Sequence, residues 1–398
     1  MIFSMNDMRK DGVILSNARS ENEILQEADH LYSKKNGLTF EEVAPKGPPE
    51  NMVSIDEYFS HPQTYDFVLD VRSSAEFAES HIPNAINFEI LDNYQRREVG
   101  ILYKNRGKQI ATQKALDFAN PKLKELKKIT QSKKSILIYC WRGGGRSAFV
   151  FEALRKIGLN NISRLKGGYK AYRKWVHNKL YQTTYPKLII VKGMTGVGKT
   201  ELLHKISSNF RVLDLEYNAR HCASSFGSIP YELRNQYEIP SQKLFEDRIF
   251  GQLYLSQTPI SAVGVLVESE SRKIGHRKIP PALFEAMLAS NTIEVTANLD
   301  SRVNRIYNEY VGSNQAGVEL LKRDLKKIQR YLSSQKFQSM QDSLNKLNLK
   351  EFISDCLVNY YDQRYAGNYN QKTVAKIDNS DSEEGYQQLM HFLSRDSC

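Results

Sequence analysis

The segment 139–148 (YCWRGGGRSA) contains a cysteine in a setting that suits nucleophilic chemistry. Cys140 follows the apolar run 135–139 and precedes a helix predicted over 147–157. Three glycines in a row let the backbone turn so that several N–H groups point inward, and the helix N-terminus adds positive potential. These groups favour a thiolate, so we predict Cys140 as the catalytic nucleophile. An inert buried cysteine is the alternative, but it would need neither the glycines nor the neighbouring arginines.

The same loop predicts an anion site. Two arginines flank the glycines, and guanidinium groups bind phosphate-type anions through strong, often paired hydrogen bonds. The predicted anion-binding residues are Arg142, Gly143, Gly144, Gly145 and Arg146.

A second glycine-rich loop, 193–200 (GMTGVGKT), fits the pattern G-x-x-x-x-G-K-[ST]. It follows the apolar run 187–191 and opens the amphipathic segment 201–206, which is the order that a phosphate-binding loop (P-loop) requires. An incidental glycine-rich turn is the alternative, and this order disfavours it. Backbone N–H groups of a P-loop hold a diphosphate, the lysine neutralises its charge, and the hydroxyl can hold Mg²⁺. The predicted diphosphate-binding residues are Gly193, Thr195, Gly196, Gly198, Lys199 and Thr200.

Acidic residues that support such a metal are expected at the ends of neighbouring strands. Asp214 and Glu216 in VLDLE, and Glu268 near the end of the run 261–269, have this placement; we predict Asp214 and Glu268 as the supporting acids. The four cysteines show no C-x-x-C pair, so no structural metal site is predicted.

Both loops require parallel sheets to hold them. Apolar runs predict two sets of strands, alternating with helical segments, and the stretch 301–361 is mostly helical. The predicted class is α/β, with an N-terminal βα domain, then a P-loop parallel α/β domain that ends in a helical part. The first strand set is 65–71, 86–88, 135–139 and 162–165, and the second is 187–191, 211–216, 261–269 and 293–299. The predicted divisions are 1–51 (an extension without assigned function, with a linker at 44–50), 52–178, 187–300, 301–370 (helical and basic) and 371–398 (a polar tail).

Length and composition fit this division. The 398 residues, 40% hydrophobic and 25% charged, correspond to about two to three globular domains. No apolar run is long enough to span a bilayer, and charges interrupt the first twelve residues, so a cytoplasmic location is predicted. The net charge of +11 favours a polyanionic partner. The basic segments 121–134 and 301–330 are either solvated helix faces or an RNA backbone track.

The cysteine loop resembles the active-site loop of the rhodanese family, in which a persulfide-carrying cysteine is followed, after five residues, by an arginine that opens a helix. The spacing from Cys140 to Arg146 fits. The stretches 69–88 (LDVRSSAEFAESHIPNAINF) and 166–175 (KGGYKAYRKW) are similar to other parts of that family. The resemblance covers about residues 52–178, and it implies that Asp70 and Arg72 support the loop.

A rhodanese-like domain followed by a P-loop domain on a basic chain resembles the tRNA 2-selenouridine synthase family. The resemblance covers about residues 52–370 and includes further segments at 212–227, 240–242, 267–275 and 360–365. One departure is that Cys222 and Ala223 follow His221, where the family usually has Arg-Gly.

This resemblance implies a transferase that converts 2-thiouridine at the wobble position of tRNA into 2-selenouridine, with selenophosphate as selenium donor. It also implies an S-geranyl intermediate made from geranyl diphosphate. Cys140 would handle selenium, Arg142 and Arg146 would hold selenophosphate, and the P-loop would hold the diphosphate of geranyl diphosphate. Two alternatives stay open: an ATP-dependent, rhodanese-type tRNA sulfurtransferase, and an RNA-binding protein in which both domains are regulatory.

Overall fold

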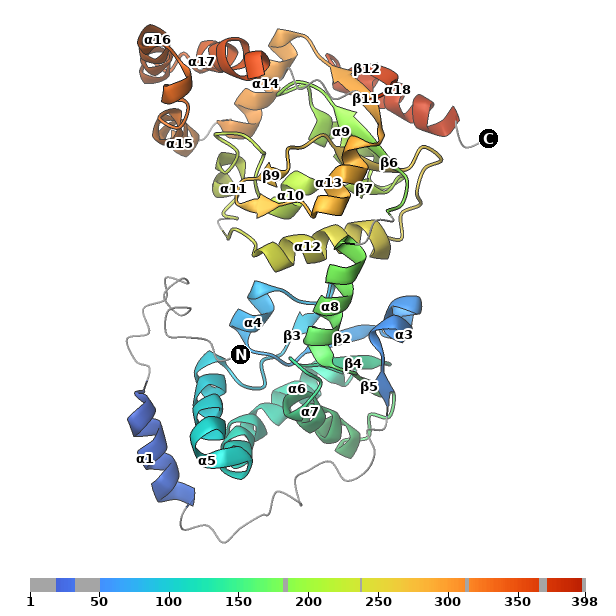
Figure 1. The fold of residues 1–398 in the computed structure, drawn as a ribbon, viewed down its shortest axis with the longest axis vertical. Coiled ribbons are helices and arrows are strands. Elements are labelled where there is room, and N and C mark those ends of the chain that lie inside the picture. Colours follow the sequence, from blue (N-terminus) through green and yellow to red (C-terminus); the bar gives the residue numbers. More distant parts are fainter. Residues whose placement is uncertain are drawn as a thin grey trace. The chain divides into compact units, whose positions relative to one another are not determined.

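A computed structural model describes residues 19–32, 51–181, 185–236, 238–311, 315–364 and 371–395. The predicted linker at 44–50 lies outside these residues. The chain divides into two units, Met1–Arg173 and Lys174–Cys398 (Figure 1).

The first unit is built on a five-stranded parallel sheet with the strand order β1-β5-β4-β2-β3. All four residues of β4 are buried, as expected of a central strand covered on both faces. Its strands are β1 (Met52–Val53), β2 (Phe67–Asp70), β3 (Ile86–Asn87), β4 (Ile136–Tyr139) and β5 (Ile162–Leu165). Its helices are α1 (Glu21–Tyr32), α3 (Ile55–Ser60), α4 (Ser74–Glu79), α5 (Asn93–Ala119), α6 (Leu123–Thr130), α7 (Gly145–Lys156) and α8 (Gly168–Tyr181), the last of which continues into the second unit.

Local sequence explains how several of these helices begin. Ser73 and Glu76 form a capping box at the start of α4. Within the predicted extension, Ile24 and Ala28 of α1 pack against Leu102 and the neighbouring turns of α5. Part of that extension is therefore a helix packed on the first unit.

The second unit contains another five-stranded parallel sheet, in the order β12-β11-β6-β8-β7. The two sheets confirm the predicted α/β class. The strands of this unit are β6 (Leu188–Lys192), β7 (Val212–Leu213), β8 (Val265–Glu268), β11 (Asn291–Thr296) and β12 (Thr373–Asp378), with a separate hairpin of β9 (Lys273–Ile274) and β10 (Arg277–Lys278). Its helices are α9 (Lys199–Ile206), α10 (Leu215–Ala219), α11 (Ile229–Leu233), α12 (Gln242–Phe250), α13 (Pro281–Leu288), α14 (Leu299–Tyr310), α15 (Gln315–Leu325), α16 (Ser334–Asn345), α17 (Leu349–Cys356) and α18 (Ser382–Arg395).

The structure corrects the prediction of a polar tail at 371–398. Residues 373–378 form β12, which pairs with β11 at the edge of the second sheet, and α18 follows it (Figure 1). Leu389 and Leu393 of α18 are fully buried against the core of the P-loop sheet. Few apolar residues suffice here because β12 is an edge strand, of which only Ile377 is buried.

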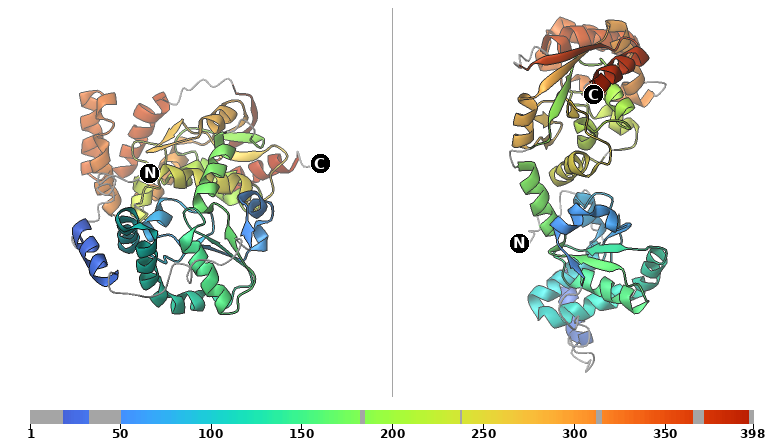
Figure 2. Two further views of the ribbon diagram at one scale, coloured as in Figure 1. Left: turned by 60° about the horizontal axis from the view of Figure 1, so that its bottom comes forward. Right: turned by 90° about the vertical axis from the view of Figure 1, so that its right-hand side faces the viewer.

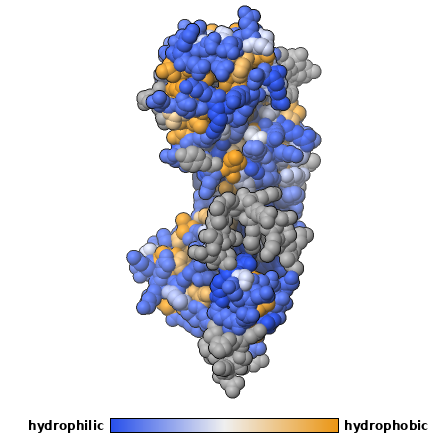
Figure 3. Space-filling model, turned by 90° about the vertical axis from the view of Figure 1, so that its left-hand side faces the viewer, coloured by the Kyte–Doolittle hydropathy of each residue, from blue (hydrophilic) through white to orange (hydrophobic). Residues whose placement is uncertain are grey.

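The predicted helical region is present as α14 to α17. Three of these helices, α15, α16 and α17, lie together beside α14 (Figure 2). Their core, which includes Val318, Leu344 and Phe352, is separate from the core of the sheet. The face of the molecule drawn in Figure 3 is mostly hydrophilic, with small scattered hydrophobic groups. Within the described ranges, no helix has the length and apolar character needed to cross a membrane.

Candidate functional site

Cys140 lies where β4 ends and the loop to α7 begins. Its side chain is buried, and its Sγ donates a hydrogen bond to Ser147 Oγ of α7 over 3.3 Å. Its carbonyl accepts a hydrogen bond from the backbone N–H of Tyr169, at the start of α8, at 2.9 Å. Elements on both sides of the loop therefore fix the position of the predicted nucleophile at the N-terminus of α7.

The glycines of the cysteine loop, residues 140–146, have different structural roles. Gly143 has a φ of 67°, and a Cβ atom there would lie 2.7 Å from the carbonyl oxygen of Leu165, so a larger residue does not fit. Gly144 and Gly145 are exposed, and a Cβ atom at either would meet nothing within 4 Å. Because Gly144 is the N-cap of α7, it leaves the first turn of that helix open to an anion.

The two predicted anion-binding arginines differ in their surroundings. Arg142 is exposed at the rim of the loop. Arg146 donates two hydrogen bonds to the carboxylate of Glu76 in α4, at 2.6 and 3.2 Å. Burial lowers the pKa of the Arg146 guanidinium, but Glu76 more than offsets this and keeps that pKa above its ordinary value. Arg146 is thus a fixed positive charge with part of its donor capacity already in use.

Arg164 is a member of this site that the sequence analysis missed. It lies in β5, and its Nη2 donates to the carbonyl of Gly143 at 2.7 Å. Its Nε is buried without a hydrogen-bond partner in the part of the chain that the structure describes. The signal in the sequence was an arginine two residues after Ile162, on the same core-facing side of a strand.

Asp70 and Arg72, the predicted loop supports, form a buried ion pair behind the cysteine loop. Arg72 Nε lies 3.0 Å, and its Nη2 2.6 Å, from the carboxylate of Asp70. The guanidinium also lies over the ring of Tyr169, 3.9 Å from its centroid. The N–H of Tyr169 donates to the carbonyl of Cys140, so Tyr169 connects this ion pair to the predicted nucleophile.

The P-loop connects the central strand β6 to α9. Lys199 folds back over it, and its Nζ donates to the carbonyl of Gly193 at 2.8 Å. Gly198 is the N-cap of α9 with a φ of 84°, and a Cβ atom there would lie 2.5 Å from the side-chain nitrogen of Asn379. The loop therefore has the tight turn and the helix N-terminus that diphosphate binding requires.

The structure brings one of the two predicted acids to the P-loop hydroxyl and replaces the other. Thr200 Oγ1 donates to Glu268 Oε1 at 2.5 Å and lies 3.4 Å from Glu216 Oε2. Asp214 is instead the N-cap of α10: its Oδ1 accepts from the N–H of Tyr217, and its Oδ2 lies 2.6 Å from His204 Nε2. Glu216, and not Asp214, lies near this hydroxyl because VLDLE leaves the strand after Leu213 and turns into a helix.

The electrostatics around Thr200 fit a divalent cation. Burial, followed by the charges of neighbouring carboxylates, raises the pKa of Glu268 to about 8 and that of Glu216 well above its ordinary value. Glu268 Oε2 is buried without a hydrogen-bond partner among the described residues. A hydroxyl beside an unsatisfied carboxylate oxygen matches the ligands of Mg²⁺ at phosphate sites. Thr200 and Glu268 are the residues that would hold this ion.

Residues far along the chain also hold the P-loop in place. Arg302 Nε donates to the carbonyl of Thr195 at 2.9 Å, and its Nη atoms bind the carboxylate of Asp362 at 2.6 and 3.0 Å. The side chain of Asn379, just after β12, donates to the carbonyl of Val197 at 2.8 Å. No role was predicted for these three side chains from the sequence, although Asp362 lies in the segment 360–365, which resembles the family.

Two family models match the chain. One, described as "tRNA 2-selenouridine synthase AAA domain", matches residues 186–396, which is more than half of the chain, and the other, "Rhodanese-like domain", matches residues 55–174. The chain belongs to the tRNA 2-selenouridine synthase family. The predictions of the family, of the order of its two domains and of an enzyme of this type are confirmed.

Curated relatives carry the same family name, tRNA 2-selenouridine synthase. The protein of Nitrosomonas europaea is 34% identical over 260 residues, which cover 63% of this chain and 65% of that protein. The protein of Chromohalobacter salexigens is 29% identical, with 75% of this chain and 86% of that protein covered. The protein of Shewanella frigidimarina is 31% identical, with 72% and 81% covered.

The two basic segments of this selenouridine synthase family member differ in how much charge they leave exposed. Lys124, Lys127 and Lys128 on α6 are exposed. In the segment 301–330, by contrast, three arginines form ion pairs: Arg302 with Asp362, Arg305 with Glu201, and Arg323 with Glu232. The first segment therefore keeps more of its positive charge available for a polyanion.

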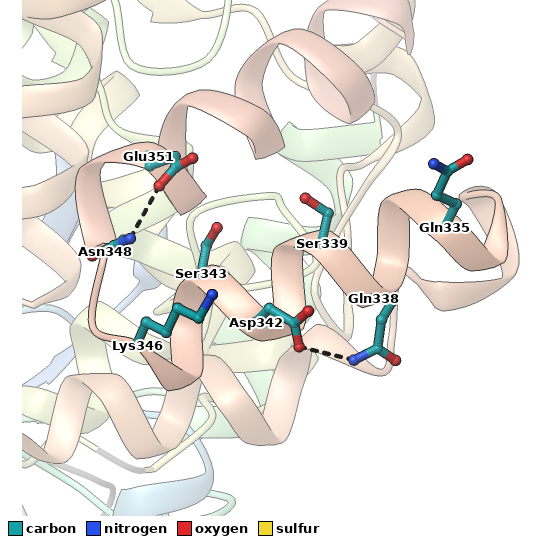
Figure 4. Close-up of a pocket in the computed structure, with 8 residues that line it drawn as sticks. All are labelled: Gln335, Gln338, Ser339, Asp342, Ser343, Lys346, Asn348 and Glu351. Atoms are coloured by element: carbon teal, nitrogen blue, oxygen red, sulfur yellow. Dashed lines mark hydrogen bonds between the residues drawn. The ribbon is translucent and has the colours of Figure 1, made fainter.

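A polar groove of about 500 Å³ lies between α16 and α17 in this family member (Figure 4). Four of its polar side chains form two hydrogen-bonded pairs within the groove, Gln338 with Asp342 and Asn348 with Glu351. Lys346 is the one cation among its lining residues, beside two carboxylates. This composition does not suit a phosphate.

Proposed function

We propose that the chain is a tRNA-modifying transferase that replaces the sulfur of 2-thiouridine at the wobble position with selenium. The observation that carries the proposal is the pair of family matches, one on each unit, because each matched region contains one of the two reactive loops. The shared name of the relatives supports tRNA as the substrate and 2-selenouridine as the product. Selenophosphate and geranyl diphosphate are the proposed co-substrates.

The first proposed step is alkylation of the tRNA sulfur at the P-loop. The sulfur of 2-thiouridine attacks C1 of geranyl diphosphate, the C1–O bond breaks, and diphosphate leaves. Lys199 and the N–H groups of the loop neutralise the charge that develops on this leaving group. Mg²⁺ held by Thr200 and Glu268 would supply further charge neutralisation.

The second proposed step is displacement of the alkylated sulfur. Alkylation makes the sulfur on C2 a better leaving group. A selenium nucleophile then attacks C2, the C2–S bond breaks, and the sulfur leaves as geranyl thiol. The Cys140 thiolate attacks the phosphorus of selenophosphate, the P–Se bond breaks, and hydrogen selenide is released beside the loop as the nucleophile for C2. Water then cleaves the S–P bond on Cys140 and releases phosphate. The open N-terminus of α7, with exposed Arg142 and fixed Arg146, would hold the selenophosphate anion.

The second candidate function is ATP-dependent sulfur transfer to tRNA. The contact of Thr200 with Glu268 favours it, since the same pair would serve Mg²⁺ bound to ATP. Titration with both ligands separates the candidates. Preferential binding of ATP that geranyl diphosphate cannot displace would contradict geranyl transfer.

The deciding experiment is mass spectrometry of wobble nucleosides after 2-thiouridine tRNA is incubated with the full chain, geranyl diphosphate and selenophosphate. Geranylated and selenated products are expected from the wild type, and Cys140→Ala should lose selenation. If neither product forms, but sulfur enters tRNA when ATP and a persulfide donor are supplied, the sulfurtransferase is correct. An RNA-binding role alone predicts no product under either condition.

A further inference from the structure

An apolar cavity of about 50 Å³ lies beside the P-loop in the second unit. Its walls come from the P-loop, α14, α15, α17, the short helical segment Leu357–Tyr361 that follows α17, and the loop that precedes α11. Most of its lining side chains are buried hydrocarbon or aromatic groups. The lining residues are Thr195, Ser224, Phe226, Ile306, Tyr310, Leu321, Phe352, Ile353, Cys356, Leu357 and Tyr361.

The cavity shares a wall with the P-loop itself. Thr195, a predicted diphosphate-binding residue, is one of its lining residues. A Cβ atom on Gly196 would lie only 2.9 Å from Cδ1 of Ile306, so the backbone of the loop rests on the cavity wall. Arg302 fixes this arrangement, because it binds both the carbonyl of Thr195 and the carboxylate of Asp362. A ligand whose diphosphate lies in the loop therefore starts next to the cavity.

The lining discriminates between classes of diphosphate ester. A nucleobase needs hydrogen-bond partners for its ring nitrogens and exocyclic groups. The hydroxyl of Ser224 is already engaged: it accepts from the N–H of Phe226 and hydrogen-bonds with Tyr361. The thiol of Cys356 is buried, and burial raises its pKa far above the ordinary value, so it stays a neutral, weakly polar group. Such walls suit a hydrocarbon chain.

We propose that this cavity holds the hydrocarbon chain of the diphosphate ester bound at the P-loop, so that the enzyme recognises a prenyl-type diphosphate by both ends. This inference rests on the proposed function, because it assumes that the P-loop binds such an ester. Each methylene group buried in an apolar site adds about fourfold to affinity. The small volume limits how much hydrocarbon the cavity can take, so binding is expected to be sensitive to chain length.

The test compares the affinities of inorganic diphosphate, dimethylallyl diphosphate and geranyl diphosphate for the full chain, by calorimetry in the presence of Mg²⁺. The wild type should bind both prenyl esters more tightly than diphosphate. Leu321→Phe fills the cavity from α15, away from the P-loop, and should weaken geranyl diphosphate binding at least tenfold without changing diphosphate binding. Leu325→Phe is the matched control, since Leu325 is buried one turn later in the same core but does not line the cavity.

A second variant keeps the test decisive if Leu321→Phe fails to fold. Ile353→Ala enlarges the cavity and should shift preference from geranyl towards farnesyl diphosphate. If the wild type binds prenyl esters tightly but neither variant alters selectivity, the cavity assignment is overturned while the proposed function stands. If the wild type binds the esters no better than diphosphate, the assignment is overturned as well. Binding of ATP alone would overturn the proposed function and the cavity assignment together.

Discussion

At the scale of single residues, Glu76 connects α4 to the cysteine loop through its ion pair with Arg146. Burial alone would raise the pKa of this carboxyl, but the hydrogen bonds and charge of Arg146 outweigh burial and lower it from the ordinary 4.5 to about 2. The folded state therefore prefers the ionised carboxylate more strongly than the unfolded chain does. The stabilisation is complete above about pH 4.5 and disappears as the pH falls towards 2.

Glu76→Gln should remove this stabilisation. We expect the variant to be less stable than the wild type at pH 7 by up to about 3 kcal/mol, since each pKa unit corresponds to about 1.4 kcal/mol. The difference should shrink as the pH falls from about 4.5 towards 2. Urea unfolding followed by tryptophan fluorescence measures it, in a Trp175→Phe background that leaves Trp141 of the first unit as the reporter.

Glu125→Gln is the control, because Glu125 is an exposed carboxylate of α6. It should change stability little at any pH. A Glu76→Gln penalty that stays constant down to pH 2 would show that lost packing, not charge, is responsible.

The residues that the sequence analysis identified are those whose spacing is local. Cys140 and the P-loop were predicted because seven or eight neighbouring residues carry the pattern. Arg164 and Asn379 were missed because they reach the loops only through the pairing of strands distant in sequence. Glu216 was considered with Asp214, but the choice between them depends on where a strand ends, and a strand boundary is weakly encoded.

At the scale of elements, β12 and α18 complete the P-loop sheet. The strands around the two loops were predicted well because they are buried on both faces and form continuous apolar runs. The edge strand β12 (TVAKID) has no such run, since five of its six residues remain partly or fully exposed. It was therefore indistinguishable from a polar tail.

Asn379→Ala should weaken binding at the P-loop although Asn379 is not predicted to touch the ligand. Removing its side chain leaves the buried carbonyl of Val197 without this donor, and we expect roughly tenfold weaker binding of inorganic diphosphate. Calorimetry with diphosphate and Mg²⁺ measures the loss. Gln388→Ala is the control, because Gln388 accepts from the N–H of Asp378 on the exposed side of the same segment. Equal losses in both variants would show general loosening of the edge instead of loop support.

At the scale of the whole molecule, the two reactive loops lie on different units, so the proposed steps should be separable. Lys199→Ala should lower geranylation of 2-thiouridine tRNA by about 100-fold or more, because a preorganised charge on the leaving group is lost. It should still convert tRNA that is already geranylated, since the diphosphate has left before the second step. Cys140→Ala should show the opposite pattern and accumulate geranylated tRNA.

Nucleoside mass spectrometry with both tRNA substrates measures the two steps. Lys205→Ala is the control for Lys199→Ala, because Lys205 also lies on α9 but bonds to Ser382 at the surface. If Lys199→Ala fails on geranylated tRNA that the wild type converts, the two steps share the P-loop and the division of labour is wrong.

The position of β12 in the chain also has a consequence for biosynthesis. Val197 and its partner Asn379 are 182 residues apart. At about 5–20 residues per second, a ribosome needs on the order of 10–40 seconds to add that length. In the later part of this interval β11 has been made but β12 has not, so β11 has one unpaired edge, whereas every strand of the first sheet has already been made. We therefore expect the second unit of the nascent chain to depend on chaperones more than the first unit does.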